Sequence, residues 1–117
     1  MNHKRKTAED LNCGLVIAGK AFGSKWKPCL LDAIHRGFRR PSEMHREIAE
    51  ASPRVLDMQL RELESDGLVG KEQRSIYPLH TEYFLTATGR SVLPLLAAME
   101  KWGNRHKEIY IKESQPV

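Results

Sequence analysis

One segment constrains the fold of this chain more than any other: SPRVLDMQLRELESDGLV, residues 52–69. Ser52 is a favoured helix N-cap residue, and Pro53 suits the first helical position, where a missing N–H costs little. Three leucines follow at helical spacing: Leu56, Leu60 and Leu63. An Asp-Gly pair then forms a turn signal in front of an apolar run. The segment predicts an amphipathic helix over residues 53–65 that leads directly into a strand.

Three further helices are expected before this one. Apolar residues recur at helical spacing at about 11–22, 24–37 and 39–51. We expect Ser24 to cap the second of these helices and Pro41 to open the third.

The sequence after the Asp-Gly pair predicts a β-hairpin and a last helix. The runs LVGKE and TEYFLT are rich in apolar, aromatic and β-branched residues and are expected to pair as antiparallel strands. The polar link between them contains Pro78 and is too long for a two-residue turn. The last helix is expected from Thr86 to about residue 111. This order of elements predicts a mainly helical α+β fold, a helix-turn-helix followed by a wing.

The chain has 117 residues and no internal repeat or linker, which predicts a single domain. We expect a flexible basic N-terminus over 1–10, the domain over 11–111 and a flexible tail over 112–117. Apolar runs stay well short of the roughly 20 residues that a membrane span needs. The N-terminus lacks the apolar core of a signal peptide, so a cytoplasmic protein is expected. The net charge of +4 is compatible with a polyanionic partner.

The helix over 53–65 presents a polar face opposite its leucines. That face carries Arg54, Asp57, Met58, Arg61 and Ser65. Arginine can donate two hydrogen bonds to guanine, and methionine can contact the thymine methyl group, so the face suits a major groove. A simpler interpretation is that Asp57 and Arg61, four residues apart, form a solvent-exposed ion pair. The wing that follows favours the interpretation as a DNA-reading helix.

The two cysteines, Cys13 and Cys29, are too few for a disulfide scaffold and lack metal-ligand spacing. Cys13 precedes the first helix, where backbone N–H groups and nearby basic residues can make a thiol reactive. Cys29 is expected to be a small buried hydrophobic residue. The five histidines show no ligand spacing, and no nucleophile motif or phosphate loop is present. We therefore expect no metal, no cofactor and no enzymatic activity.

The last expected helix is apolar on more than one stripe, because Val92, Leu93, Leu95, Leu96, Met99 and Trp102 cannot all face one core. The excess indicates that a second surface covers this helix, and another subunit is the expected partner.

Several motifs resemble the HxlR-type winged helix-turn-helix family of bacterial transcriptional regulators, which has a MarR-like architecture. The resemblance covers about Cys13 to Trp102. It rests on Cys13, on GSKW at 23–26, on LRELESDGLV from Leu60, on Pro78, Glu82, Tyr83, Leu85, Thr86 and Gly89, and on Leu93, Pro94 and Trp102. The chain departs from the family in having RPSEM at 40–44, Asp57 in place of threonine, Gln59 in place of a basic residue and Arg74 in place of tyrosine.

The resemblance implies a homodimer, formed by the terminal helices, that binds double-stranded DNA at a pseudo-palindromic operator. The two reading helices would enter successive major grooves, with half-site centres roughly 34 Å or about 10 bp apart. The expected interface residues are Leu11, Leu15, Leu95, Leu96, Met99 and Trp102. The expected DNA contacts are Lys25, Arg39, Arg40, Ser52, Pro53, Arg54, Asp57, Met58, Arg61, Lys71, Arg74 and His80. The last three of these are expected near the hairpin tip, where phosphates or a minor groove would meet them.

The resemblance also implies a bacterial protein that associates with the nucleoid when bound. Some relatives use the thiol equivalent to Cys13 to sense oxidants or electrophiles; the alternative is an ordinary cysteine at the dimer seam. Two other functions stay open at the level of sequence. One is a dimerisation module that recruits a protein partner without binding DNA, and the other is a thiol-dependent redox protein. The small-molecule effector is unknown.

Overall fold

In a computed structural model, which describes residues 12–76 and 78–114, helix α5 (Pro53–Ser65) has the bounds that the sequence predicts. The Ser52 hydroxyl accepts a hydrogen bond from the Val55 N–H at 3.2 Å, and Pro53 occupies the first turn. The three leucines are at most 1% exposed. Gly67 then adopts a φ of 80°, a conformation that glycine enters without strain, and turns the chain into the wing.

Three helices precede α5: α2 (Gly14–Phe22), α3 (Lys27–His35) and α4 (Pro41–Glu47). The prediction that Ser24 caps the second helix is wrong. Trp26 is the N-cap residue of α3, and the Ser24 hydroxyl donates instead to Gln59 Oε1 on α5 at 3.4 Å. The third helix is shorter than expected, since it ends at Glu47 and the next residues form the turn into α5.

The start of α4 is held by one carboxylate. Glu43 Oε1 accepts hydrogen bonds from the N–H groups of Arg39 and Arg40, both at 3.0 Å. These N–H groups lie at a helix start, where an acceptor side chain replaces missing backbone partners. The hydrogen bond from Arg40, followed by that from Arg39, lowers the pKa of the Glu43 carboxyl.

The wing consists of β1 (Val69–Ile76) and β2 (Leu79–Leu85), paired antiparallel. Both strands run further than predicted, so only two residues separate them, and the expectation of a longer link is wrong. The ladder continues through polar residues because an antiparallel ribbon can leave one face in water. A bulge between Gln73 and Ser75 interrupts the register. Gly70 is required near the base, because a Cβ there would lie 2.5 Å from the ring of Phe84.

The single last helix expected from the sequence is divided into α6 (Ala87–Ser91), α7 (Leu93–Arg105) and α8 (Lys107–Ser114). Pro94 lies in the first turn of α7, and its missing N–H favours a new helix start over continuation of α6. At the end of α7, the Nδ1 atom of His106 lies 2.9 Å from the Trp102 carbonyl that also accepts its backbone N–H. Helix α8 continues beyond residue 111, where we expected a tail to begin.

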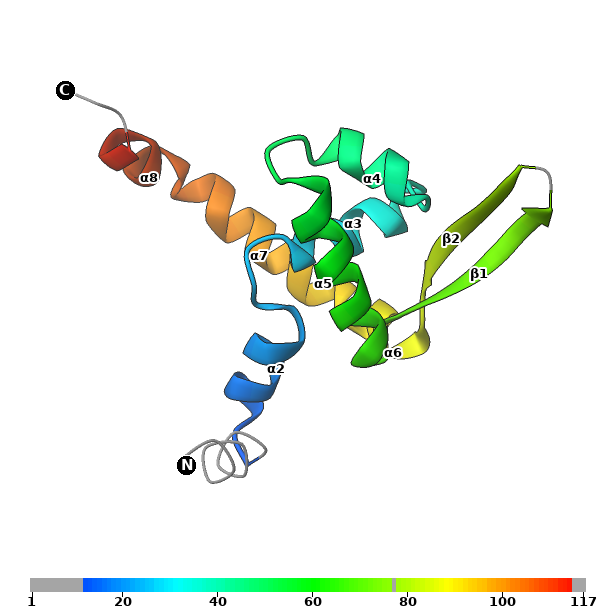
Figure 1. The fold of residues 1–117 in the computed structure, drawn as a ribbon. Coiled ribbons are helices and arrows are strands. Elements are labelled where there is room, and N and C mark those ends of the chain that lie inside the picture. Colours follow the sequence, from blue (N-terminus) through cyan, green and yellow to red (C-terminus); the bar gives the residue numbers. More distant parts are fainter. Residues whose placement is uncertain (1–11, 77, 115–117) are drawn as a thin grey trace, which may run out of the picture.

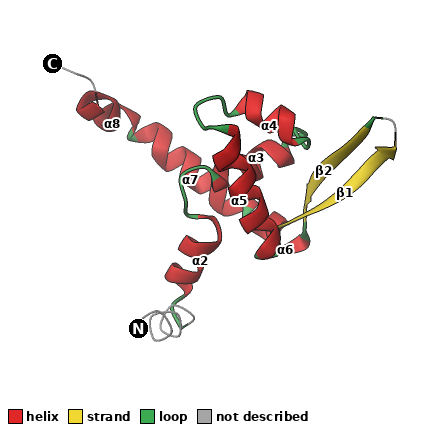
Figure 2. Ribbon diagram, viewed as in Figure 1, coloured by secondary structure: helices red, strands yellow, loops and turns green. Residues whose placement is uncertain are grey.

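The core joins α3, α4, α5, the base of the wing and α7. Its residues are Leu30, Leu31, Ala33, Ile34, Met44, Ile48, Ala51, Leu56, Leu60, Leu63, Leu68, Val69, Tyr83, Leu85, Val92 and Leu96. Figure 1 shows the wing, α2 and α8 projecting from this centre in three directions, and Figure 2 shows that the wing is the only β-structure among the described residues. Within 12–76 and 78–114, no helix combines the length and apolarity needed to cross a membrane.

Candidate nucleic-acid interface

The outward face of α5 is the centre of the candidate interface. Arg54, Met58, Arg61 and Ser65 are all exposed and share the side of the helix opposite the buried leucines. Ser52 and Pro53 are also exposed at its N-terminal end. The structure therefore places together five of the expected DNA contacts, Ser52, Pro53, Arg54, Met58 and Arg61.

Besides the packing of its buried leucines, α5 makes two polar contacts with the start of α3 and the residues before it. The Lys27 ammonium, whose side chain is 6% exposed, lies 2.9 Å from the Glu62 carboxylate. The Ser24–Gln59 hydrogen bond is the second contact. Gln59 is consequently buried and does not belong to the outward face. Sequence reasoning missed Lys27, because a lysine in the first turn of a helix resembles any other solvated cation.

The environment of Asp57 differs from the one expected from the sequence. Its Oδ1 atom lies 2.7 Å from Nε2 of His45 on α4, so its ion-pair partner is not Arg61. The side chains of Asp57 and His45 are 42% and 24% exposed, which puts the pair at the edge of the α5 face. His45 was not among the expected contacts, since the α4–α5 turn alone brings it to this edge.

The basic residues of the wing are paired with carboxylates of the same chain. Lys71 faces Tyr83 near the base of the hairpin and lies 3.6 Å from Glu64 on α5, so the prediction that it lies near the tip is wrong. Arg74, at the bulge, lies 2.9 Å from Glu72 and 3.7 Å from Glu82.

His80 completes this arrangement. Its Nε2 atom lies 3.3 Å from Glu82. Glu72 and Glu82 are direct partners across the two strands, an arrangement in which like charges destabilise a sheet. Arg74 pairs with both carboxylates and offsets that repulsion, and His80 adds a hydrogen-bond contact to Glu82, so both have a structural role besides any contact with DNA.

The loop before α4 adds basic residues beside the wing. Arg39 and Arg40 are exposed, and the Arg39 carbonyl accepts a hydrogen bond from the Tyr83 N–H at 2.8 Å, which ties the loop to β2. A hollow of about 310 Å³ lies between them, lined by Arg39, Glu72, Arg74, Glu82, Tyr83 and Phe84. Burial, with the Glu64 and Asp57 carboxylates, raises the pKa of the Tyr83 phenol.

Lys25 is exposed, with its ammonium 4.9 Å from the centroid of the Trp26 ring.

Both cysteines are exposed. Cys13 is the N-cap residue of α2, as its position before the first helix suggested. The prediction that Cys29 is buried is wrong, because the core side of α3 is formed by Leu30, Leu31, Ala33 and Ile34. Partial burial, followed by the Asp32 and Glu50 carboxylates, raises the pKa of the Cys29 thiol.

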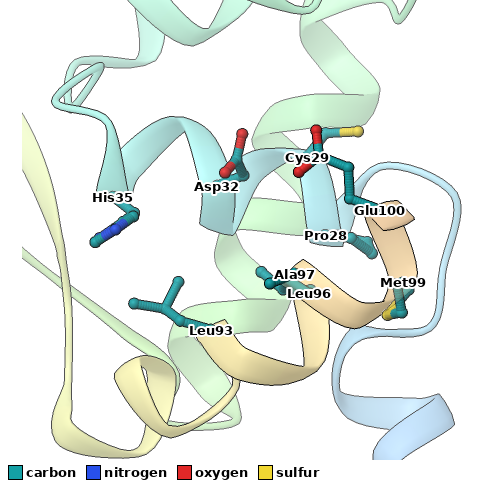
Figure 3. A pocket seen from close by; sticks show the side chains of 9 residues that line it. All are labelled: Pro28, Cys29, Asp32, His35, Leu93, Leu96, Ala97, Met99 and Glu100. Atoms are coloured by element: carbon teal, nitrogen blue, oxygen red, sulfur yellow. The ribbon is translucent and has the colours of Figure 1, made fainter. Parts of the chain in front are cut away.

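Cys29 lines a second hollow, of about 430 Å³, between α3 and α7. Figure 3 shows its lining, which consists of Pro28, Cys29, Asp32, His35, Leu93, Leu96, Ala97, Met99 and Glu100. No group of three metal-ligating side chains occurs in the part of the chain that the structure describes.

The terminal helices expose large apolar side chains. Leu15 on α2 is 86% exposed, and Leu95, Met99 and Trp102 on α7 are also exposed. Leu96 is instead 9% exposed and packs in the core of its own subunit, which corrects its expected place at the interface. Leu11 lies outside the described residues.

Further exposed apolar residues, which sequence reasoning missed, are Ile17, Ile109, Tyr110 and Ile111. Trp102 stacks on His106 with ring centroids 4.4 Å apart, and the ring centroids of Trp102 and Tyr110 are 6.3 Å apart. A cluster of three rings therefore spans α7 and α8.

The chain is similar to known transcriptional regulators over most of its length. The profile of the HxlR-like helix-turn-helix family matches residues 21–110. A helix-turn-helix-type transcriptional regulator of Methanothermobacter thermautotrophicus is 39% identical over 94 residues, which cover 80% of this chain and 72% of that protein. The regulator YkvN of Bacillus subtilis is 34% identical over 97 residues, covering 83% of this chain and 82% of YkvN.

Solved structures show the same fold. The redox regulator HypR in its reduced form superimposes with a TM-score of 0.77 at 32% sequence identity, covering 86% of this chain and 99% of HypR. The structure of the B. subtilis regulator YodB in its reduced form, with a TM-score of 0.68 at 23% identity, is similar in fold.

Proposed function

The chain belongs to the HxlR-like helix-turn-helix family, whose members are transcriptional regulators and not enzymes, and from this premise we propose that it is a homodimer that binds a pseudo-palindromic operator. The observation that carries the proposal is the exposed stripe of Arg54, Met58, Arg61 and Ser65 on a helix anchored by its neighbours. These side chains offer guanidinium donors and a methyl group to base edges in a major groove.

Phosphate contacts flank this stripe in the proposed complex. Lys25, Arg39 and Arg40 are exposed and available to phosphates. Lys71, Arg74 and His80 reach phosphates only by leaving their carboxylate partners, which reduces the net gain from each contact. We therefore assign most of the phosphate affinity to the first group and to the N-terminal end of α5.

The dimer rests on the exposed apolar residues of α2, α7 and α8. None of the residues of α2 is buried in the subunit, although Leu15 and Ile17 are apolar. A two-fold interface would remove these side chains and the exposed residues of α7 from water. Such a dimer binds two half-sites whose centres lie roughly 34 Å apart. The site of action is the nucleoid, in the cytoplasm.

Two measurements test this function. In vitro selection from random duplexes should enrich an inverted repeat. Binding to it should weaken as salt rises, because the release of counterions from the DNA then gains less free energy. Sedimentation should show a dimer, and Leu15→Glu should give a folded monomer that binds a half-site weakly. Leu15 is suited to this change because it makes little contact within the subunit. Enrichment of no sequence, with retained capture of a protein partner by an Arg54→Ala/Arg61→Ala variant, would favour the protein-interaction alternative.

Control by thiol oxidation is a second part of the proposal. The exposure of Cys13 supports it, as does similarity to HypR, which is a redox regulator. Two Cys13 thiols of a dimer, or one thiol and a small electrophile, would be the reacting groups. Diamide should change operator binding of the wild type and of Cys29→Ser but not of Cys13→Ser. Equal responses of all three proteins would exclude Cys13 as the sensor.

A further inference from the structure

Asp57 is a carboxylate on a surface that is otherwise suited to DNA. It lies three residues after Arg54 and four before Arg61, so all three side chains follow one strip of α5. With 42% of its side chain exposed, Asp57 is accessible to a ligand of that strip. Near phosphates a carboxylate is repelled, so this residue needs a specific donor on the DNA to be compatible with binding.

The contact with His45 leaves Asp57 with one free acceptor. His45 Nε2 lies 2.7 Å from Oδ1. An ionised carboxylate has two oxygens and about four acceptor sites, so Oδ2 remains available. None of the residues that the structure describes donates to Oδ2. The ion-pair partner of Asp57 is therefore His45 and not Arg61, which lies four residues later on the same helix.

Cytosine presents the base edge that best suits a lone carboxylate oxygen. In the major groove cytosine presents an amino donor, whereas guanine presents two acceptors and thymine an acceptor beside a methyl group. Adenine has an amino donor next to an acceptor, which favours an amide over a carboxylate. Along α5, Asp57 lies about 4.5 Å from the level of Arg54 and about 6 Å from that of Arg61, a span comparable with one to two base-pair steps.

We propose that Asp57 reads a cytosine in each operator half-site and that His45 is the residue that positions its carboxylate. The cytosine lies within about two base pairs of the guanines that Arg54 and Arg61 read. This inference rests on the proposed function, since it specifies the chemistry by which the same surface selects its DNA.

In vitro selection with the full-length protein tests the assignment. The motif selected by the wild type should contain one position, here called the cytosine column, at which cytosine is preferred. Asp57→Ala should abolish this preference, which lowers the discrimination against other bases at that position by about 5- to 150-fold. Asp57→Asn, which has nearly the same shape, should move the preference at that column toward adenine. The remaining columns should be unchanged in both variants.

His45 is tested by its own pair of variants. His45→Gln keeps a side-chain donor and should retain the cytosine column, whereas His45→Leu should weaken it. Thermal melting of both proteins separates this effect from loss of the α4–α5 packing. Glu64→Gln is the matched control, because it removes another carboxylate of α5 that pairs with Lys71. It should raise affinity for all sequences without changing any column.

The outcomes separate the inference from the proposed function. A wild-type motif whose columns survive Asp57→Asn unchanged would overturn the role of Asp57 and leave the regulator function intact. A cytosine column that survives His45→Leu but not Asp57→Asn would overturn the role of His45 alone. Selection of no motif by the wild type would overturn both proposals.

Discussion

The ammonium of Lys27, almost fully buried on α3, lies 2.9 Å from the half-exposed carboxylate of Glu62 on α5. This ion pair joins the core side of the domain to the helix that carries the candidate DNA contacts. A buried ammonium without a partner is costly, because desolvation is not compensated.

We expect Glu62→Ala to lower the free energy of unfolding by about 1–3 kcal/mol, since Lys27 would lose its charged hydrogen-bond partner. Lys27→Met/Glu62→Ala should recover part of the loss, because methionine fills a similar volume without a charge. Urea unfolding of the two variants and the wild type measures the difference. A double variant that is less stable than the single one would show that the pair is not the source of the effect.

The lowered pKa of the Glu43 carboxyl predicts that this residue stabilises the fold less at acidic pH. Its pKa is lowered in the folded protein by the N–H groups of Arg40 and Arg39, so its contribution is present above the unfolded pKa of about 4.3 and is lost as the pH falls through the lower folded value. Glu43→Gln should therefore remove stability at pH 6 and little at pH 3. Melting temperatures across this range provide the measurement. A constant difference at every pH would contradict the assignment.

Arg61 and Lys71 should differ in the kind of DNA affinity that they supply. Arg61→Ala is expected to weaken binding to the selected operator by about 1–3 kcal/mol with a smaller loss on random duplexes. Lys71→Ala should weaken both duplexes similarly, because a phosphate contact carries no sequence information. Fluorescence anisotropy at several salt concentrations measures both. Equal losses on the two duplexes for Arg61→Ala would refute base reading by that residue.

Cys29 should react slowly with alkylating agents despite its exposure. Partial burial and the Asp32 and Glu50 carboxylates raise the pKa of the thiol, so a smaller fraction is thiolate near pH 8. In Cys13→Ser, iodoacetamide should label Cys29 more slowly than it labels free cysteine, with a rate that keeps rising at higher pH. Asp32→Asn should increase the rate at pH 8, and an unchanged rate would remove Asp32 as a cause.

The local elements were largely predictable. Ser52, Pro53 and the leucine spacing defined α5 with its observed bounds, because N-caps and amphipathic periodicity act within a few residues of chain. Other local signals were misread. Ser24 is a good cap by type but bonds to α5, and the strands extend through polar residues because pairing across the ribbon outweighs individual strand preferences.

The candidate site was only partly predictable. The outward stripe of α5 follows from the buried leucines. Asp57 and Arg74 stood out because they depart from the pattern of the HxlR-type family. Their partners were not visible, because His45 is twelve residues from Asp57, and Glu82 meets Arg74 only through the strand register. The exposure of Cys29 likewise depends on which side of α3 faces the core.

By itself the sequence determined the order of elements, the bounds of α5 and its exposed stripe, since turn residues, caps and periodic apolar positions are short-range properties of the chain. Only the tertiary structure decided which charges are paired: Lys27 with Glu62, Asp57 with His45, and Arg74 with Glu72 and Glu82. The physical reason is that an ion pair depends on a distance of a few ångströms between side chains, and that distance is set by how helices and strands pack rather than by their positions along the chain.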